Sequence, residues 1–193
     1  KKRQRGKAGL ISGERKPLLG GGKTKMKANY HTHTYRCHHA VGTEREYVEA
    51  AIRAGLQILG FSDHSPYVFK DGHYSSFRMR PEELPEYVQT LSGLREEYKE
   101  QIQIHIGLEA EYYRENWSDY LNLLKGSGVE YLILGQHYAD GEYPGAEYSG
   151  KPSDDEKRLR AYVDSVLEGV NTGLFSYVAH PVILNFTGEE AVY

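Results

Sequence analysis

The chain alternates short apolar segments with longer amphipathic ones, and this alternation limits its possible folds more than any other feature. The apolar segments are typical of strands and cover residues 27–33, 56–64, 101–112, 129–137 and 175–181. The amphipathic segments are typical of helices and cover residues 43–54, 80–100, 118–128 and 153–173. Strands that alternate with helices favour a parallel sheet or barrel. We therefore predict an α/β fold.

Capping signals support the helical segments. Thr43 with Glu46 and Ser153 with Glu156 each have the spacing of a capping box, and Gly55 ends the first helix. The segment 80–100 has a proline in its first turn. Its apolar residues follow a helical period and are Leu84, Val88, Leu91, Leu94 and Tyr98.

The composition is that of an ordinary globular domain, with 193 residues, 39% hydrophobic residues and 26% charged residues. No apolar run reaches the length of a membrane helix, so we expect no membrane partner. The basic start lacks the apolar region of a secretory signal. A single cysteine excludes an internal disulfide framework and fits a reducing cytoplasm, which is the location we predict.

The charge is unevenly distributed along the chain. Residues 1–27 contain ten Lys or Arg and one Glu, a charge of +9, and we predict that they form a disordered basic leader. The whole chain carries −3, so the predicted domain, residues 28–193, carries −12. This acidic body lacks the positive field of a nucleic-acid binder, and nucleic acid is not an expected partner. If the substrate is an anion, bound metal would supply the local positive charge.

Histidines and one glutamate follow the predicted strands. The segment 29–40, NYHTHTYRCHHA, contains four histidines, and each remaining strand also ends on a histidine or a carboxylate. In a parallel barrel these ends converge on one face, where active sites are built. One such histidine is more often an ordinary loop residue, but five strand ends agree. The candidate metal ligands are His31, His33, His39, His64, Glu109, His137 and His180.

This ligand set indicates the metal. Imidazoles with a carboxylate suit zinc, manganese or iron. Seven ligands are too many for one tetrahedral ion, so we predict a divalent metal cluster of two or three ions, which Glu109 is able to bridge. Of the neighbours His38 and His39, one is expected to ligate and the other to pack, and His39 is our candidate.

Other polar residues in these segments are interpreted one by one. Asp63 adjoins His64 and is expected to orient a ligand or to bind metal directly, and these two are our candidate catalytic residues. Cys37 is either a soft ligand or a small buried thiol, and we favour the thiol. We interpret His105 and His73 as structural: His105 because the strand pattern turns it away from the site, His73 because it lies in a polar loop.

Together, these motifs resemble the PHP (polymerase and histidinol phosphatase) superfamily, and within it the histidinol-phosphatase branch. The matching pieces are HTHTYRCHHA, GFSDHSP, GLEAEY, LGQHY and AHPVILNFTG, in this order over residues 29–188. The resemblance implies a distorted (βα)7 barrel with a trinuclear metal site and phosphoesterase activity. It also implies that Glu109 is the bridging carboxylate, and that the six histidines named above are the other ligands.

The chain departs from the family pattern at its end. The family places an Asp-x-His pair on the last strand, and this sequence stops at Tyr193 without one. About five of seven βα units are present. We therefore expect a C-terminally truncated barrel that lacks two ligands and has reduced activity.

The resemblance and the ligand set give one functional hypothesis: hydrolysis of L-histidinol phosphate, a small phosphorylated substrate, in histidine biosynthesis. Arg78 and Arg80 are candidates for binding the phosphate, the alternative being solvated surface charges. A second hypothesis is another PHP phosphoesterase that acts on nucleotides or nucleic-acid ends. A third is a metal-binding module without catalysis.

Overall fold

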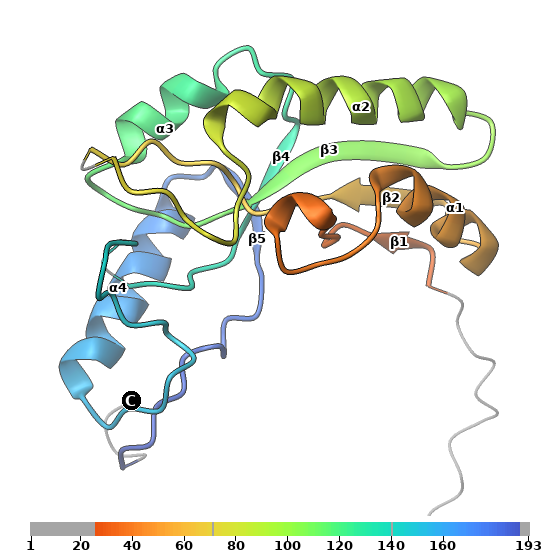
Figure 1. Cartoon of the computed structure of the whole chain (residues 1–193). Helices are drawn as coiled ribbons and strands as arrows, with labels where there is room; N and C mark the ends of the chain where they lie inside the picture. Colours follow the sequence, from red (N-terminus) through yellow and green to blue (C-terminus); the bar gives the residue numbers. More distant parts are fainter. Residues whose placement is uncertain (1–25, 71, 140, 190–193) are drawn as a thin grey trace, which may run out of the picture.

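In the part of the chain that the structure describes, five parallel strands form one sheet in the order of the sequence. The strands are β1 (Ala28–Asn29), β2 (Ile58–Phe61), β3 (Gln103–Ala110), β4 (Tyr131–Leu134) and β5 (Phe175–Val178). The sheet curls, so that the strands form an open half-barrel (Figure 1). This confirms the predicted α/β class and the five strands of the predicted units.

A computed structural model describes residues 26–70, 72–139 and 141–189. The predicted basic leader, residues 1–27, lies almost wholly outside the described residues, and its disorder stays a prediction. Within the described part of the chain, every helix is too short or too polar to cross a membrane.

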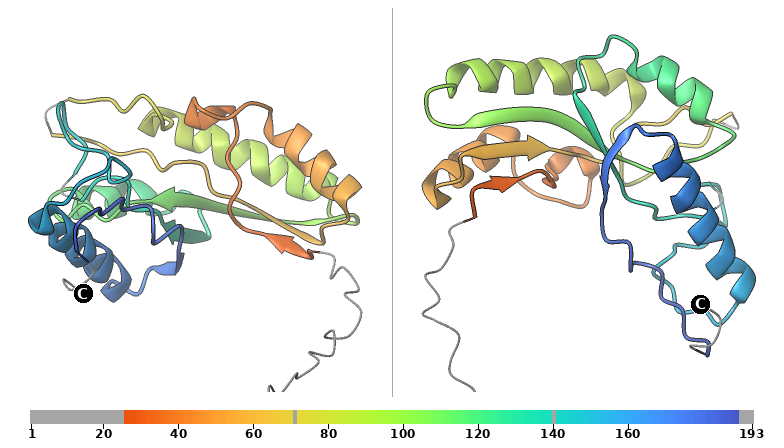
Figure 2. Two further views of the ribbon diagram at one scale, coloured as in Figure 1. Left: turned by 90° about the horizontal axis from the view of Figure 1, so that it is seen from below. Right: turned by 180° about the vertical axis from the view of Figure 1, so that it is seen from behind.

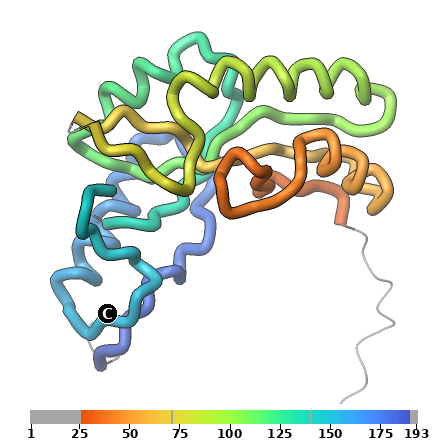
Figure 3. The backbone as a smooth tube through the Cα atoms, viewed as in Figure 1, coloured from red at the N-terminus to blue at the C-terminus, as the bar shows by residue number. Residues whose placement is uncertain are grey.

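Among the described residues, the helices beside the sheet are α1 (Glu44–Ala54), α2 (Leu84–Glu97), α3 (Trp117–Leu124) and α4 (Glu156–Asn171). Helix α2 runs along β3, and α4 packs against β4 and β5 (Figure 2). Two short 3-10 turns, Tyr35–Cys37 and Pro81–Glu83, precede α1 and α2. The tube in Figure 3 follows the chain from β1 through the first of these turns to α1.

The alternation of β3 separates an apolar face from a polar one. Ile104, Ile106 and Leu108 are buried in the hydrophobic core, together with side chains of α2 such as Leu91 and Leu94. The intervening residues of a strand point to the opposite face. That face carries His105, Gly107 and Glu109, and it is where the candidate ligand Glu109 lies.

Tyr131 lies across this polar face. A Cβ atom added to Gly107 of β3 or to Gly60 of β2 would collide with the Tyr131 side chain, so both strands need glycine where the ring crosses them. The Tyr131 hydroxyl lies 2.9 Å from the carbonyl oxygen of Tyr30 and 2.8 Å from that of Phe61. The ring thus ties β4 to β2 and to the end of β1.

Backbone hydrogen bonds hold the carboxyl ends of the strands side by side beyond the regular sheet. Ser65 N donates to Glu109 O at 2.8 Å, and Gly135 N donates to Ala110 O at 3.0 Å. Ala179 N donates in the same way to the carbonyl of the last residue of β4, at 2.8 Å. Side chains that follow neighbouring strands are therefore brought to one edge.

Two details differ from the sequence predictions. The first strand is regular only over Ala28–Asn29, so His31 and His33 lie in the segment that follows it. The predicted capping box of Ser153 and Glu156 is wrong, because Asp155 is the N-cap of α4, and its side chain accepts a hydrogen bond from the backbone of Lys157 at 2.9 Å.

The predicted ends of α1 and the predicted proline in the first turn of α2 can also be compared with the structure. The capping box of Thr43 and Glu46 is confirmed, and Gly55 ends α1 in the left-handed conformation with φ 76°. Pro81 begins a 3-10 turn, and Pro85 occupies the first turn of α2.

Candidate metal centre

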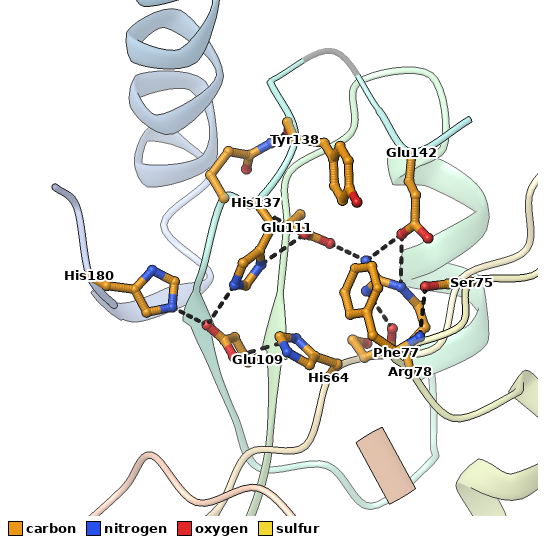
Figure 4. A network of polar contacts seen from close by, with 12 residues as sticks. His64, Ser75, Phe77, Arg78, Glu109, Glu111, His137, Tyr138, Glu142 and His180 are labelled. Carbon is orange, nitrogen blue, oxygen red and sulfur yellow. Dashed lines mark hydrogen bonds and ion pairs between the residues drawn. The ribbon is translucent and has the colours of Figure 1, made fainter. Parts of the chain in front are cut away.

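Glu109 is the centre of the candidate site. Its side chain is 1% exposed, and each of its two oxygens faces different histidines. The Oε2 atom lies 2.9 Å from His33 Nε2, 3.2 Å from His31 Nε2 and 3.4 Å from His64 Nδ1. The Oε1 atom lies 2.7 Å from His180 Nε2 and 4.0 Å from His137 Nε2. Figure 4 shows Glu109 between His64, His137 and His180.

His39 completes the cluster on the side of His33 and His64. Its ring centroid lies 5.7 Å from that of His33 and 5.0 Å from that of His64. The structure thus brings together all seven side chains that the sequence nominated as metal ligands. They come from the ends of all five strands.

The backbone at His180 adopts an uncommon conformation. Its φ of 35° lies in the left-handed region, which costs a non-glycine residue about 1–3 kcal/mol. This turn, directly after β5, carries the ring to Glu109. Such conformations persist only where the surrounding structure holds them in place, and they cluster at functional sites.

The donor set fits a metal ion. Three groups of potential ligands have all their donor atoms within 4.8 Å of one another: His33 with Cys37 and His39, His31 with Glu109 and His180, and His33 with His64 and Glu109. The Nδ1 atom of His64 is buried without a hydrogen-bond partner among the described residues, and it lies 3.4 Å from Glu109 Oε2. Buried polar atoms normally have a partner, so an unpartnered nitrogen that faces a carboxylate is what a cation site provides.

Electrostatics agree with this interpretation. Burial lowers the pKa of His64 to about 2, which keeps its imidazole neutral, as a metal ligand must be. Burial alone would raise the pKa of Glu109, but hydrogen bonds with His180, His31 and His33 outweigh burial and hold that pKa well below its ordinary value. The site therefore presents an ionised carboxylate to whatever cation it binds.

His33 is the exception among the imidazoles. Burial alone would lower its pKa, but hydrogen bonds with Cys37 and Glu109 outweigh it and raise the pKa to about 9. Without metal, His33 therefore holds a proton beside the Glu109 carboxylate. A metal cation that binds there displaces this proton and supplies the positive charge in its place.

Asp63 lies behind the cluster. It is fully buried, its Oδ1 accepts a hydrogen bond from Thr34 N at 2.6 Å, and its Oδ2 accepts one from Thr34 Oγ1 at 3.0 Å. Burial raises the pKa of Asp63 to about 6, against the lowering effect of these hydrogen bonds. Of the two roles expected for Asp63, this geometry fits orientation of the segment that carries His33, and direct metal binding by Asp63 stays a prediction.

Glu111 is a site residue that the sequence reasoning missed. One of its oxygens lies 2.9 Å from His137 Nδ1, and the other lies 2.6 Å from Arg78 Nη2. Burial would raise the pKa of Glu111, but Arg78 and His137 lower it to about 2. The signal was present in the sequence, because residues 109 and 111 share a face in an extended segment.

The two arginines nominated for phosphate lie in different environments. Arg78 is 3% exposed, and its guanidinium contacts the carboxylates of Glu111 and Glu142. These contacts exclude the alternative of a solvated surface charge for Arg78, and its phosphate contact stays a prediction. Arg80 is exposed, with its guanidinium 5.1 Å from the centre of the Tyr74 ring, and its phosphate contact stays a prediction.

His105 and His73 lie outside the cluster, as expected. The reason given for His105 is wrong, because residues 105 and 109 share a face of β3. His105 is separate because it lies at the other end of that strand, where its Nδ1 is 3.2 Å from Glu130 Oε2. His73 Nε2 lies 3.5 Å from Glu142 Oε1.

Two residues of the segment 29–40 remain. His38 is exposed and has φ 60°, and its Nδ1 lies 3.2 Å from the carbonyl oxygen of Ser76, away from Glu109. Cys37 is buried, and its thiol donates to the carbonyl of Thr34 at 3.0 Å. Because Cys37 also lies within reach of His33 and His39, both alternatives for its thiol remain open.

A cavity of about 250 Å³ opens beside the cluster. Its walls combine candidate ligands with aromatic side chains, and its lining residues are His39, His64, Phe77, His137, Tyr138 and Tyr148. The Tyr148 ring is stacked on His137, with ring centroids 6.3 Å apart. A small molecule with one anionic end and one planar end would match these walls.

Comparison with known proteins gives consistent results. The family model described as the PHP domain matches residues 29–190. A Deinococcus radiodurans protein named "Probable histidinol-phosphatase" is 32% identical over 155 residues, which cover 78% of this chain and 58% of that protein. The histidinol-phosphatase of Bacillus subtilis is 32% identical over 132 residues, which cover 64% of this chain and 49% of that protein. The chain spans about half the length of the curated relatives it matches.

A solved structure shares the fold. The histidinol phosphate phosphatase of Lactococcus lactis matches with a TM-score of 0.61 and 25% identity, over 80% of this chain and 57% of that one. That crystal structure is a complex with zinc, L-histidinol and phosphate.

Proposed function

The chain belongs to the PHP domain family, and we propose that it is a metal-dependent phosphomonoesterase that hydrolyses L-histidinol phosphate to L-histidinol and phosphate, a step of histidine biosynthesis. One observation carries this proposal: the ends of five strands surround Glu109 with six histidines. The ligands named for the Lactococcus lactis structure support the choice of substrate.

We propose that the seven clustered side chains hold two or three divalent ions, zinc, manganese or iron. The donor chemistry supports these metals, because imidazole and carboxylate are ligands that all three accept. When bound, the ions would supply positive charge that stabilises the phosphoryl group in the transition state and makes water a stronger nucleophile. Glu109 lies between the two sets of histidines and is the residue suited to bridge them.

The protein's own residues would position the substrate. The cavity beside the cluster could hold a phosphate near His64 and His137, with the organic half against Phe77, Tyr138 and Tyr148, which line it. Aromatic walls favour a planar group such as the imidazole of histidinol, by stacking. Arg80 is a candidate for a further contact with the phosphate. We place this activity in the cytoplasm, because a single cysteine fits a reducing compartment.

The test is phosphate release by the metal-loaded protein from L-histidinol phosphate, from a 5′-nucleotide and from a simple aryl phosphate. We expect the highest kcat/KM for L-histidinol phosphate, and loss of that activity in the His31→Ala, His33→Ala double variant. Preference for the nucleotide would instead support the second phosphoesterase hypothesis. Metal binding without release from any of the three esters would overturn the proposed activity and leave a metal-binding module.

A further inference from the structure

A chain of buried charges leads away from the cluster through His137. Glu111 accepts hydrogen bonds from the backbone N of His137 at 3.3 Å and faces its Nδ1 at 2.9 Å, both through Oε1. Its Oε2 lies 2.6 Å from Arg78 Nη2. Figure 4 shows His137 between Glu111 and Glu109, with dashed lines to both carboxylates.

This arrangement sets the tautomer of His137. A carboxylate that a guanidinium holds on one oxygen acts only as an acceptor on the other. His137 Nδ1 must therefore carry the proton that is shared with Glu111. The lone pair is left on Nε2, which is the nitrogen that faces Glu109 at 4.0 Å. Nε2 is also the nitrogen that a metal ion between His137 and Glu109 would need.

Arg78 is held firmly enough to act as a clamp. Its Nη1 donates to the carbonyl of Ser65 at 2.9 Å, and its Nε and Nη2 donate to Glu142 Oε2 at 3.1 and 2.7 Å. Its guanidinium carbon lies 4.4 Å from the centre of the Phe77 ring. A side chain held on several sides fixes the carboxylate that it touches.

The geometry points to Glu111 as the positioning residue that sets the tautomer and the direction of His137 for the metal centre, with Arg78 as the clamp that holds Glu111. This inference rests on the metal centre of the proposed function. It requires no particular substrate, since Glu111 acts only through His137. Carboxylates behind a ligating histidine typically contribute about ten- to a hundred-fold to metal affinity.

Glu111→Gln is the decisive variant because it conserves shape. If the amide oxygen faces Arg78, the amide NH2 faces His137 Nδ1 and demands the wrong tautomer. If the amide is flipped, its NH2 group faces the guanidinium of Arg78, and two hydrogen-bond donors then oppose each other. We expect zinc affinity to fall by about tenfold or more. We also expect metal-free Glu111→Gln to show the Nε2–H tautomer of His137 by long-range proton–nitrogen NMR, whereas the metal-free parent shows Nδ1–H.

The chain offers a matched control. Arg95, Glu130 and His105 form the same kind of triad at the other end of β3, with Arg95 Nη1 2.7 Å from Glu130 Oε1 and Glu130 Oε2 3.2 Å from His105 Nδ1. Glu130→Gln should leave zinc affinity and the His137 tautomer unchanged. An equal loss of affinity in both variants would show a general effect on stability and would overturn the specific role.

Arg78→Lys separates a clamp from a phosphate ligand. A clamp role predicts lower zinc affinity, because lysine cannot contact Glu111, Glu142 and the Ser65 carbonyl at once. A phosphate-binding role predicts unchanged zinc affinity and weaker inhibition by inorganic phosphate. The second result would overturn the clamp.

The parent protein alone gives a further test that requires no variant to fold. An Nε2–H tautomer of His137 in the metal-free parent would overturn the inference. Among the variants, normal zinc affinity in Glu111→Gln would also overturn the inference. Because these measurements use the metal and the tautomer, a parent that binds zinc but releases no phosphate would refute the proposed function and leave this inference standing.

Discussion

The carboxylate of Glu109 occupies the space that a side chain at position 135 would fill. A Cβ atom added to Gly135 would collide with Oε1 of Glu109 and would lie within 2.8 Å of its Cγ. Gly135 follows β4 and is held to the end of β3 by the hydrogen bond from its N to the carbonyl of Ala110. The Glu109 carboxylate can therefore occupy its central position only if residue 135 is a glycine.

Gly135→Ala should displace Glu109, because the backbone on both sides is fixed by the sheet and the carboxylate has to give way. We expect zinc affinity to drop by about tenfold or more, the scale on which indirect changes at metal sites are felt. The measurement is zinc titration against a chelator, with circular dichroism to confirm the fold. The control is Gly93→Ala, in the exposed middle of α2, where an added Cβ meets nothing within 4 Å. It should leave affinity unchanged and stabilise the helix by up to about 1 kcal/mol.

The His31→Ala, His33→Ala double variant should lose bound metal. These two rings approach one oxygen of Glu109, at 3.2 and 2.9 Å, and their removal takes two donors from the same ion. Metal analysis after loading at neutral pH should show a lower metal content per protein than in the parent. In the parent, metal affinity should weaken progressively as the pH is lowered below about 9, the pKa of His33, because the metal must displace the proton that this imidazole then holds. A parent protein that holds no zinc, manganese or iron after loading would refute the metal centre.

The positions of the candidate ligands could be predicted from the sequence because topology alone brings them together. Parallel strands in sequence order must place their carboxyl ends at one edge, whatever the details of each strand. The prediction therefore survived an error in the first strand, which is regular over only two residues. His31 and His33 still reach the site, because Ser62 N donates to the carbonyl of Thr32 and holds the segment in line.

The roles of residues within the site could not be predicted in the same way. A sequence gives the chemical type of Arg78 but not its partners, and two buried carboxylates compete with phosphate for its guanidinium. Asp63 likewise turns to Thr34, because a buried amide there needs an acceptor. At the start of α4, Ser153 and Asp155 are both suitable N-caps, and only the backbone conformation selects Asp155.

Two substitutions at Asp63 should separate an orienting role from direct participation. Asp63→Asn keeps an acceptor for Thr34 N and offers a donor to Thr34 Oγ1, so we expect metal affinity within about threefold of the parent. Asp63→Ala leaves Thr34 N buried and unpaired, which should lower the free energy of unfolding by about 1–3 kcal/mol and weaken metal binding. Chemical denaturation and zinc titration provide the two measurements. If Asp63→Asn loses metal as completely as Asp63→Ala, Asp63 is a ligand.

The last prediction concerns the organic half of the substrate. Tyr148 lines the cavity beside the cluster and stacks on His137, yet no metal-ligand role is assigned to it. Tyr148→Ala removes one aromatic wall, and stacking of this kind is worth about 0.5–1.5 kcal/mol, so KM for L-histidinol phosphate should rise by about two- to tenfold. Tyr148→Phe keeps the ring and should leave KM near the parent value. If Tyr148 contacts the planar half of the substrate, Tyr148→Ala should change KM for an aliphatic phosphate such as glycerol phosphate less than it changes KM for L-histidinol phosphate. Metal content, measured on the same samples, should be equal in all three proteins. Equal changes in KM for both esters would place the substrate's planar group elsewhere in the cavity.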